Sequence, residues 1–256
     1  MHVPAIRSPL SAVLALCAVS LATLPRAAGA VTGAEVLARA DQAMTRASDQ
    51  AFDWEMITKE PGQPDRTLSF KVYLKGNEWR RIDFMAPGDV KGMRILVRSV
   101  SNLYVYLPAY KKVRRVASHV KEQGFMGTAF SHEEMSLVTF SPTYTAKVLE
   151  DAVKYWKLEA TLKPDADFPY TKLVVEVRKD IAQPVVIEYF NDNGLHVKTE
   201  TRLSFKCQGE ICTPTVVKMV DHTRNDLEST LKMRAWSPNS GLDDSFFTVR
   251  ALQRSR

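Results

Sequence analysis

Residues 68–98 decide the fold class, and they read LSFKVYLKGNEWRRIDFMAPGDVKGMRILVR. Apolar side chains occupy alternate positions from Leu68 to Leu74 and again from Met93 to Val97. Turn residues interrupt the pattern at Gly76-Asn77 and at Pro87-Gly88. Alternation with a period of two, broken by such turns, is typical of antiparallel strands with one apolar and one wetter face. The stretch therefore predicts a β-sheet protein.

The same pattern continues along most of the chain. Further strand-like segments lie at 80–84, 103–107, 111–116, 155–162, 173–178, 185–190, 195–205, 211–220 and 229–235. Asn193-Gly194 is the strongest hairpin signal between them. Because the connections are short and no linker interrupts them, we expect one domain, residues 31–256. The fold class is mainly β (α+β), with about eleven antiparallel strands in a single strongly curved sheet.

Only two segments have a helical pattern. Thr32 and Glu35 form a capping box before an apolar helical face, and Ser131 and Glu134 form a second one inside a loop-and-helix insertion at 118–143. A curved sheet must cover its concave apolar face. Two short helices fill that face less tightly than a second sheet would, so we expect an apolar cavity of the kind that ligands occupy.

Residues 1–30 have the features of a secretory signal peptide. Arg7 supplies a positive charge, residues 10–24 are uncharged and mostly apolar, and Ala28-Gly29-Ala30 is an A-x-A cleavage site. The apolar stretch is shorter than the roughly 20 residues of a spanning helix, and a retained N-terminal anchor is the alternative. Cleavage would remove Arg7 and Arg26 but no acid, lowering the net charge from +6 to +4. So mild a charge does not indicate nucleic-acid binding.

Two cysteines follow the predicted signal, Cys207 and Cys212, in the sequence CQGEIC. The residues between them carry a turn signal and are flanked by strand-like segments. An even pair in an exported protein predicts a disulfide across a hairpin tip. The loop-entropy estimate for so short a loop is roughly 2 kcal/mol. The spacing does not fit a redox C-x-x-C, and no paired ligands nearby indicate zinc.

The sequence lacks the common catalytic motifs. It contains no G-x-S-x-G nucleophile elbow, Walker loop, Rossmann glycine pattern or H-E-x-x-H zinc motif. The five histidines, at positions 2, 119, 132, 196 and 222, form no cluster in the sequence. We therefore expect no catalytic residue, metal or cofactor. A lipid hydrolase remains an alternative, because catalytic triads are set by geometry and not by sequence spacing.

Residues 111–115, KKVRR, are the densest run of charge. The simplest interpretation is a solvated strand face or a charged sheet edge, which discourages pairing with other chains. The alternative is that Lys111, Lys112, Arg114 and Arg115 dock onto an anionic membrane surface or an acidic partner. Export makes nucleic acid an improbable partner for this run.

Residues 102–135 carry a family resemblance. This run, NLYVYLPAYKKVRRVASHVKEQGFMGTAFSHEEM, is similar to the LolA-like outer-membrane lipoprotein-sorting proteins (LolA/LolB-type periplasmic carriers). The matching features are Tyr106-Leu107-Pro108, the basic run, Phe125-Met126-Gly127 and the acidic Glu133-Glu134. The similarity spans most of the chain after residue 30. The central motif is more specific to this broader branch than to the lipoprotein carrier itself.

The resemblance implies an incomplete antiparallel β-barrel around helices that act as a lid over a hydrophobic cavity. It also implies a periplasmic carrier that takes lipid or lipoprotein from inner-membrane transport or export machinery toward the outer membrane. In the family an arginine holds the lid closed, and the sequence alone assigns no arginine here to that role. Extracting an acyl chain of about fifteen methylenes into water costs roughly 12 kcal/mol, which such a cavity would largely remove.

The apolar faces supply the candidate site residues. The expected cavity lining is Leu68, Phe70, Val72, Ile82, Phe84, Ile95, Val97, Trp156, Leu158, Val175 and Val177. The expected lid residues are Phe125, Met126, Phe130 and Met135. A one-residue error in strand register would exchange the two faces of a strand. Besides the carrier and the hydrolase, an envelope sensor or interaction module of the same fold is a third hypothesis.

Overall fold

The computed structural model describes residues 1–2, 30–76, 79–99, 102–116 and 125–254. Residues 1–30 and residues 31–256 are separate units, and all elements below belong to the second. The predicted signal peptide lies almost entirely outside the described residues and stays a prediction. Among the described residues, no helix is both long and apolar enough to cross a membrane.

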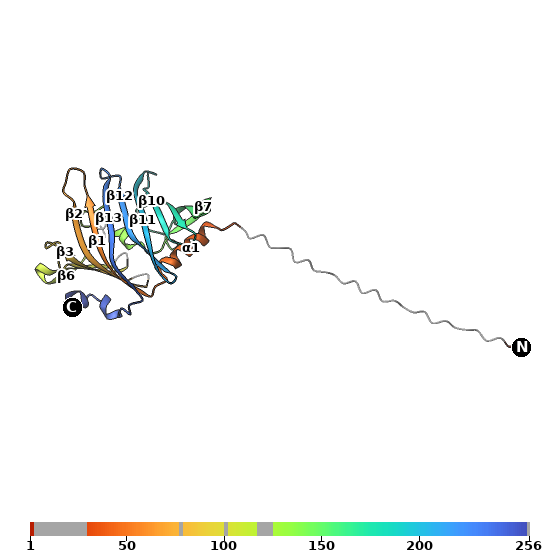
Figure 1. The fold of residues 1–256 in the computed structure, drawn as a ribbon, viewed down its shortest axis with the longest axis horizontal. Coiled ribbons are helices and arrows are strands. Elements are labelled where there is room, and N and C mark those ends of the chain that lie inside the picture. The colour runs from red at the N-terminus through yellow and green to blue at the C-terminus, as the bar shows by residue number, and fades with distance from the viewer. Residues whose placement is uncertain (3–29, 77–78, 100–101, 117–124, 255–256) are drawn as a thin grey trace. The chain divides into compact units, whose positions relative to one another are not determined.

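Thirteen strands of the described residues form one antiparallel sheet (Figure 1). The strands are β1 (Asp49–Lys59), β2 (Arg66–Lys75), β3 (Trp79–Ala86), β4 (Arg94–Ser99), β5 (Asn102–Leu107), β6 (Lys112–Arg115), β7 (Tyr144–Asp151), β8 (Tyr155–Leu162), β9 (Lys172–Arg178), β10 (Pro184–Phe190), β11 (His196–Gln208), β12 (Ile211–Asp221) and β13 (Leu227–Pro238). Their spatial order is β6-β5-β4-β3-β2-β1-β13-β12-β11-β10-β9-β8-β7. Pairing of β1 with β13 joins two meanders, and β6 and β7 remain as free edges. The predicted incomplete antiparallel barrel is confirmed.

The predicted number of about eleven strands was too low by two, because the sequence analysis missed β1 and β7. Both strands show the alternation: Phe52, Met56 and Thr58 are buried along β1, and Tyr144 begins a similar pattern in β7. In β1 the acidic residues and Gln50 interrupt the alternation of apolar side chains. β7 begins directly after the insertion, and its pattern includes the polar residues Thr145 and Lys147 and the exposed Leu149.

Strand register places the apolar side chains of neighbouring strands in rows on the inner face of the sheet. Phe52, Val72 and Ile82 are register partners, and Trp54, Phe70 and Phe84 form the next row. Adjacent residues in a strand point to opposite faces. In β4, accordingly, Ile95 and Val97 belong to the large inner core and Leu96 to a smaller outer one.

Helix α1 (Gly33–Met44) covers part of the inner face and packs against β7, β8 and β12. Its predicted capping box is present: the Thr32 side chain accepts the Glu35 N–H at 3.2 Å, and the Glu35 carboxylate accepts the Thr32 N–H at 2.8 Å. A Cβ at Gly33 would lie 2.3 Å from the Ala146 carbonyl oxygen on β7. Only glycine therefore lets the first turn of α1 approach this strand so closely.

A crossing segment, residues 125–143, lies on the inner face between the two edges of the sheet. β6 and β7 are opposite edges of the sheet, and the segment is the described part of the connection between them. The segment contains the 3₁₀ turn η3 (Phe125–Gly127) and the short helix α2 (His132–Ser136). At the sheet centre the Ala129 N–H donates to Ser229 Oγ on β13, at 2.9 Å. The Phe140 N–H donates to the Asp41 carboxylate of α1, at 2.7 Å.

The C-terminal segment, residues 239–254, covers the outer face of β2–β6. Its two 3₁₀ turns, η4 (Asp244–Phe247) and η5 (Arg250–Gln253), bring Phe246, Phe247 and Leu252 onto Leu96. Outside this segment, the 3₁₀ turn η1 (Pro108–Tyr110) links β5 to β6. The Asp49 carboxylate accepts N–H groups at the start of the segment, from Ser240, Gly241 and Leu242. Burial alone would raise the pKa of Asp49, but these hydrogen bonds lower it below its ordinary value.

Candidate functional site

A cavity of about 240 Å³ lies between the inner face of the sheet, the end of α1 and the crossing segment. Its walls are mainly apolar. The apolar lining consists of Met44, Phe52, Trp54, Phe70, Val72, Leu74, Ile82, Phe130, Met135, Leu137, Val138, Pro214, Val217 and Leu231. Pockets for small molecules are typically about 300–1,000 Å³, so the cavity as it stands is small for a long acyl chain.

Some of the predicted site residues meet in this cavity, and others do not. Phe70, Val72 and Ile82 of the predicted lining and Phe130 and Met135 of the predicted lid line it. The other predicted lining residues are buried in the inner core but do not line the cavity: Leu68, Phe84, Ile95, Val97, Trp156, Leu158, Val175 and Val177. Of the remaining lid residues, Phe125 is buried in the same core and Met126 packs against it. In the half of the sheet around β8 and β9, α1 and the crossing segment fill the space that the sequence analysis left for a ligand.

Polar side chains also line the cavity, and the sequence analysis missed them. They are Gln50, Arg80, Glu134, Gln183, Glu200, Arg202 and Thr213. Two of them come from the inner face of β11, where Lys198, Glu200 and Arg202 occupy alternate positions. Because apolar and charged residues are mixed in this strand, alternation alone did not show that its charged face points inward.

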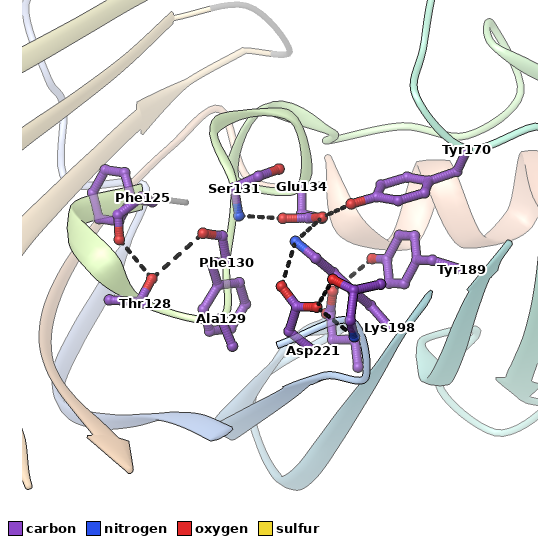
Figure 2. A network of polar contacts seen from close by, with 12 residues as sticks. Phe125, Thr128, Ala129, Phe130, Ser131, Glu134, Tyr170, Tyr189, Lys198 and Asp221 are labelled. Atoms are coloured by element: carbon purple, nitrogen blue, oxygen red, sulfur yellow. Dashed lines mark hydrogen bonds and ion pairs between the residues drawn. The ribbon is translucent and has the colours of Figure 1, made fainter. Parts of the chain in front are cut away.

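A buried ion pair joins the crossing segment to the sheet (Figure 2). Lys198 Nζ donates to Glu134 Oε1 at 2.8 Å, with the side chains 10% and 1% exposed. The Glu134 carboxylate also accepts from the Tyr170 hydroxyl and from the Ser131 N–H. Asp221 Oδ2 lies 4.0 Å from Lys198 Nζ. A buried pair of this kind depends on such additional hydrogen bonds, because desolvation of the two charges opposes their attraction.

The electrostatic surroundings shift the pKa values of this cluster. Burial, followed by the nearby charge of Glu134, raises the pKa of Tyr170 well above its ordinary range, so the phenol remains a hydrogen-bond donor. Burial would raise the pKa of Asp221, but hydrogen bonds from Thr223 and Arg224 and the charges of Lys198 and Arg224 lower it. Asp221 is therefore ionised at neutral pH.

A second buried pair lies next to the first. Arg202 Nε donates to Glu200 Oε1 at 2.6 Å, and the Tyr189 hydroxyl donates to Glu200 Oε2 at 2.8 Å. Burial alone would lower the pKa of Arg202, but the Glu200 carboxylate raises this pKa above its ordinary value. Each carboxylate that lines the cavity thus has a cation of its own.

Three arginines hold backbone carbonyls of the crossing segment. Arg66 Nη1 donates to the Met126 oxygen at 2.7 Å, Arg80 donates to the Met135 oxygen, and Arg224 donates to the Thr128 oxygen. The sequence analysis assigned no arginine to the lid. It could not do so, because every residue has a main-chain carbonyl, and the sequence does not show which carbonyls accept a hydrogen bond.

The hydrolase hypothesis requires a nucleophile and a base at the cavity. Thr199 Oγ1 lies 2.9 Å from His222 Nε2, and His222 Nδ1 lies 2.6 Å from Asp226 Oδ1, which is the order of groups in a triad. None of these three residues lines the cavity. In the part of the chain that the structure describes, no three His, Cys, Asp or Glu side chains are placed to hold a metal ion.

Two surface predictions concern the β11–β12 hairpin and β6. The disulfide Cys207–Cys212 is present between register partners at the hairpin tip, with a Cα–Cα distance of 4.1 Å, and that prediction is confirmed. Lys111, Lys112, Arg114 and Arg115 are exposed on or beside the edge strand β6. This placement agrees with a charged sheet edge, and binding of a membrane or partner there stays a prediction.

Comparisons with known proteins agree with this architecture. A family model with the description "Uncharacterized protein" matches residues 76–254. A DUF1329 family protein from Desulfovibrio piger is 26% identical over 86% of this chain and 97% of its own, with a TM-score of 0.79. A putative outer membrane lipoprotein-sorting protein domain from Vibrio parahaemolyticus is 25% identical over 87% and 98%, with a TM-score of 0.76.

A third solved structure shows the fold alone. It is a LolA superfamily protein from Nitrosomonas europaea, 21% identical over 87% of this chain and 100% of its own, with a TM-score of 0.72. Among curated proteins there is no match. The chain therefore belongs to the family that the matching model describes, and it has the LolA-like fold of lipoprotein-sorting proteins that the sequence predicted.

Proposed function

We propose that the protein is a periplasmic carrier that binds acyl chains of a lipid or lipoprotein in the inner cavity and transfers them toward the outer membrane. The observation that carries the proposal is the cavity itself. Its walls are mostly aliphatic and aromatic, and it lies between the sheet and the crossing segment. Burial of acyl methylenes there would be worth ~0.8 kcal/mol each.

The crossing segment would have to shift for an acyl chain to enter. The cavity of about 240 Å³ is smaller than the roughly 300–1,000 Å³ of typical ligand pockets. Movement would break the hydrogen bonds that Arg66, Arg80 and Arg224 make to the segment, while the sheet and α1 keep their own pairing. The segment also buries Phe125, Phe130 and Phe140 in the inner core, so its displacement exposes apolar surface that a bound acyl chain would cover again.

The proposal extends to partners and location. The predicted signal peptide and the likeness to lipoprotein-sorting proteins support a periplasmic location, with an inner-membrane transporter or export complex as the donor. The exposed basic strand β6 would face an anionic membrane surface or an acidic partner. Each Lys or Arg near an anionic membrane adds about 1 kcal/mol of attraction. No catalytic step is part of the proposal.

Native mass spectrometry of protein purified from the periplasm tests the carrier function. We expect a bound mass that corresponds to one lipid, or a shift of that size when phospholipid vesicles are added. If only the unliganded mass is observed in both cases, the carrier function is wrong. A partner protein that co-purifies in place of lipid would support the envelope-sensor alternative, and release of free fatty acid would support the hydrolase.

A matched pair of substitutions locates the binding site. Val217 lines the cavity, and its neighbour Val216 lies on the other face of β12 and does not. We expect Val217→Phe to fill the cavity and weaken lipid binding by about tenfold or more, and Val216→Phe to leave it unchanged. Equal binding by wild type and Val217→Phe would place the lipid elsewhere.

A further inference from the structure

Arg80 is a buried cation at the cavity wall for which the described residues provide no anion. It lies on β3 between its register partners Leu74 and Val97, and it is 9% exposed. Among the described residues its one acceptor is the Met135 carbonyl oxygen, which bonds to Nη1. Nε and Nη2 have no protein acceptor in the part of the chain that the structure describes. Burial lowers the pKa of Arg80 to about 10, and no neighbouring carboxylate opposes this effect.

The other charges at the cavity are already balanced. Glu134 is neutralised by Lys198, and Glu200 by Arg202. Asp221, the remaining buried acid of the cluster, pairs with Arg224 and stands near Lys198. The guanidinium of Arg80 is therefore the excess positive charge of the site. A buried charge without a counter-ion is strongly unfavourable, so an anion that entered the cavity would be attracted to it.

We propose that Arg80 binds the anionic group, a carboxylate or a phosphate, of an acyl-chain ligand, so that the cargo is an anionic amphiphile rather than an uncharged one. This inference rests on the proposed carrier function and specifies its substrate class. The free Nε and Nη2 of Arg80 form the side of the guanidinium fork that matches two oxygens of such a group. A fatty acid and a phospholipid both offer this chemistry.

The surroundings of Arg80 suit the proposed orientation. Its register partner on β2 is Leu74, and two positions along β3 lies Ile82. Both are apolar, and both line the cavity. The apolar wall continues in the same direction through the row Phe52, Val72 and Ile82. Beyond that row lie the register partners Trp54 and Phe70. An anionic head group at Arg80 would thus leave its acyl chain against the aromatic part of the wall.

Trp54 provides a direct measurement of this geometry. It lines the cavity, so a bromine atom on a bound acyl chain would quench its fluorescence by contact. The probes are 12-bromododecanoic acid, its uncharged methyl ester, and 12-bromododecyl phosphate, titrated at pH 8. Trp54→Phe identifies the part of the signal that comes from the cavity. We expect the acid or the phosphate to bind about tenfold or more tightly than the ester, and the stronger of the two indicates the source of the anion.

Two arginine substitutions separate anion binding from attachment of the crossing segment. Arg80→Gln removes the charge and keeps a donor for the Met135 carbonyl. Arg66→Gln removes a similar contact, to the Met126 carbonyl, from a residue that does not line the cavity. We expect Arg80→Gln to bind the acid and the ester equally. Arg66→Gln should change both affinities by the same factor and keep the preference.

The outcomes are distinguishable. Equal binding of the charged and uncharged probes by the wild type, or a preference that survives Arg80→Gln, would overturn the inference and leave the carrier function standing. Loss of the preference in Arg66→Gln would also overturn it, since attachment of the segment would then control selectivity. If none of the three probes quenches Trp54, the proposed function fails and the inference fails with it. Circular dichroism of each variant excludes loss of the fold as the cause.

Discussion

The two segments that cover the sheet are attached in different ways. The C-terminal segment covers the outer face with closely packed rings: Phe247 is fully buried, and its centroid lies 5.9 Å from that of Trp79. The crossing segment also buries aromatic side chains, Phe125, Phe130 and Phe140, and is held by an ion pair and arginine-to-carbonyl bonds, but it leaves a cavity beneath it. A cover that leaves a cavity beneath it loses less packing when it shifts than one packed closely on aromatic rings, so we expect the inner cover to be the one that moves.

The largest expected effect is on the outer cover. Phe247→Ala should lower the free energy of unfolding by about 4 kcal/mol, because it leaves a cavity in a small aromatic core. Urea unfolding followed by circular dichroism measures this loss. Binding of brominated acyl probes by the protein that remains folded should be unchanged. Weaker binding in this variant would contradict the separation of the two covers.

The next effect concerns the inner cover. Lys198→Met should lower the free energy of unfolding by about 3 kcal/mol, because the carboxylate of Glu134 stays buried without its cation. The double variant Glu134→Gln with Lys198→Met should regain most of that loss, since no unpaired charge remains. Urea titrations of both variants measure the difference. Equal stability of single and double variants would show that the pair does not attach the segment.

An intermediate effect depends on pH. The folded state lowers the pKa of Asp49, so its stabilising hydrogen bonds are present above its unfolded pKa of about 3.9 and are lost as the pH falls through the lower folded value. Asp49→Asn should cost about 1–2 kcal/mol at pH 7 and reduce the loss of stability on acidification. Urea unfolding at pH 7, 4 and 3 tests this. An unchanged slope with pH would assign the acid sensitivity to other carboxylates, including Asp221.

The smallest effect is expected at the surface of the inner cover. Arg66→Gln removes one exposed hydrogen bond to the Met126 carbonyl and should cost about 0.5 kcal/mol. Hydrogen exchange of the crossing segment should nevertheless accelerate, while exchange in the C-terminal segment stays constant. Equal acceleration in both segments would mean that they open together.

Much of the fold was predictable, because period-two alternation depends only on the local sequence. The antiparallel sheet, the capping box of α1 and the hairpin disulfide were all predicted from neighbouring residues. The prediction failed where the pattern was diluted, as in β1. For the cavity, the apolar faces of β2 and β3 were identified correctly as inward-facing. The equally apolar faces of β8 and β9 were assigned to it as well, because the sequence does not show where α1 and the crossing segment pack.

The sequence by itself determined that this chain forms alternating strands with too few helices to cover a wide sheet. That follows from side-chain periodicity, which needs no long-range contact. Only the tertiary structure decided that β1 meets β13, that the connection from β6 to β7 crosses the inner face, and that the charged side of β11 points inward. Those outcomes depend on residues far apart in the chain, such as Glu134 and Lys198 or Arg80 and Met135, whose contacts exist only after the sheet has formed. The placement of Arg80 at an apolar cavity without an acid is one of these outcomes, and it is where a test of cargo chemistry should begin.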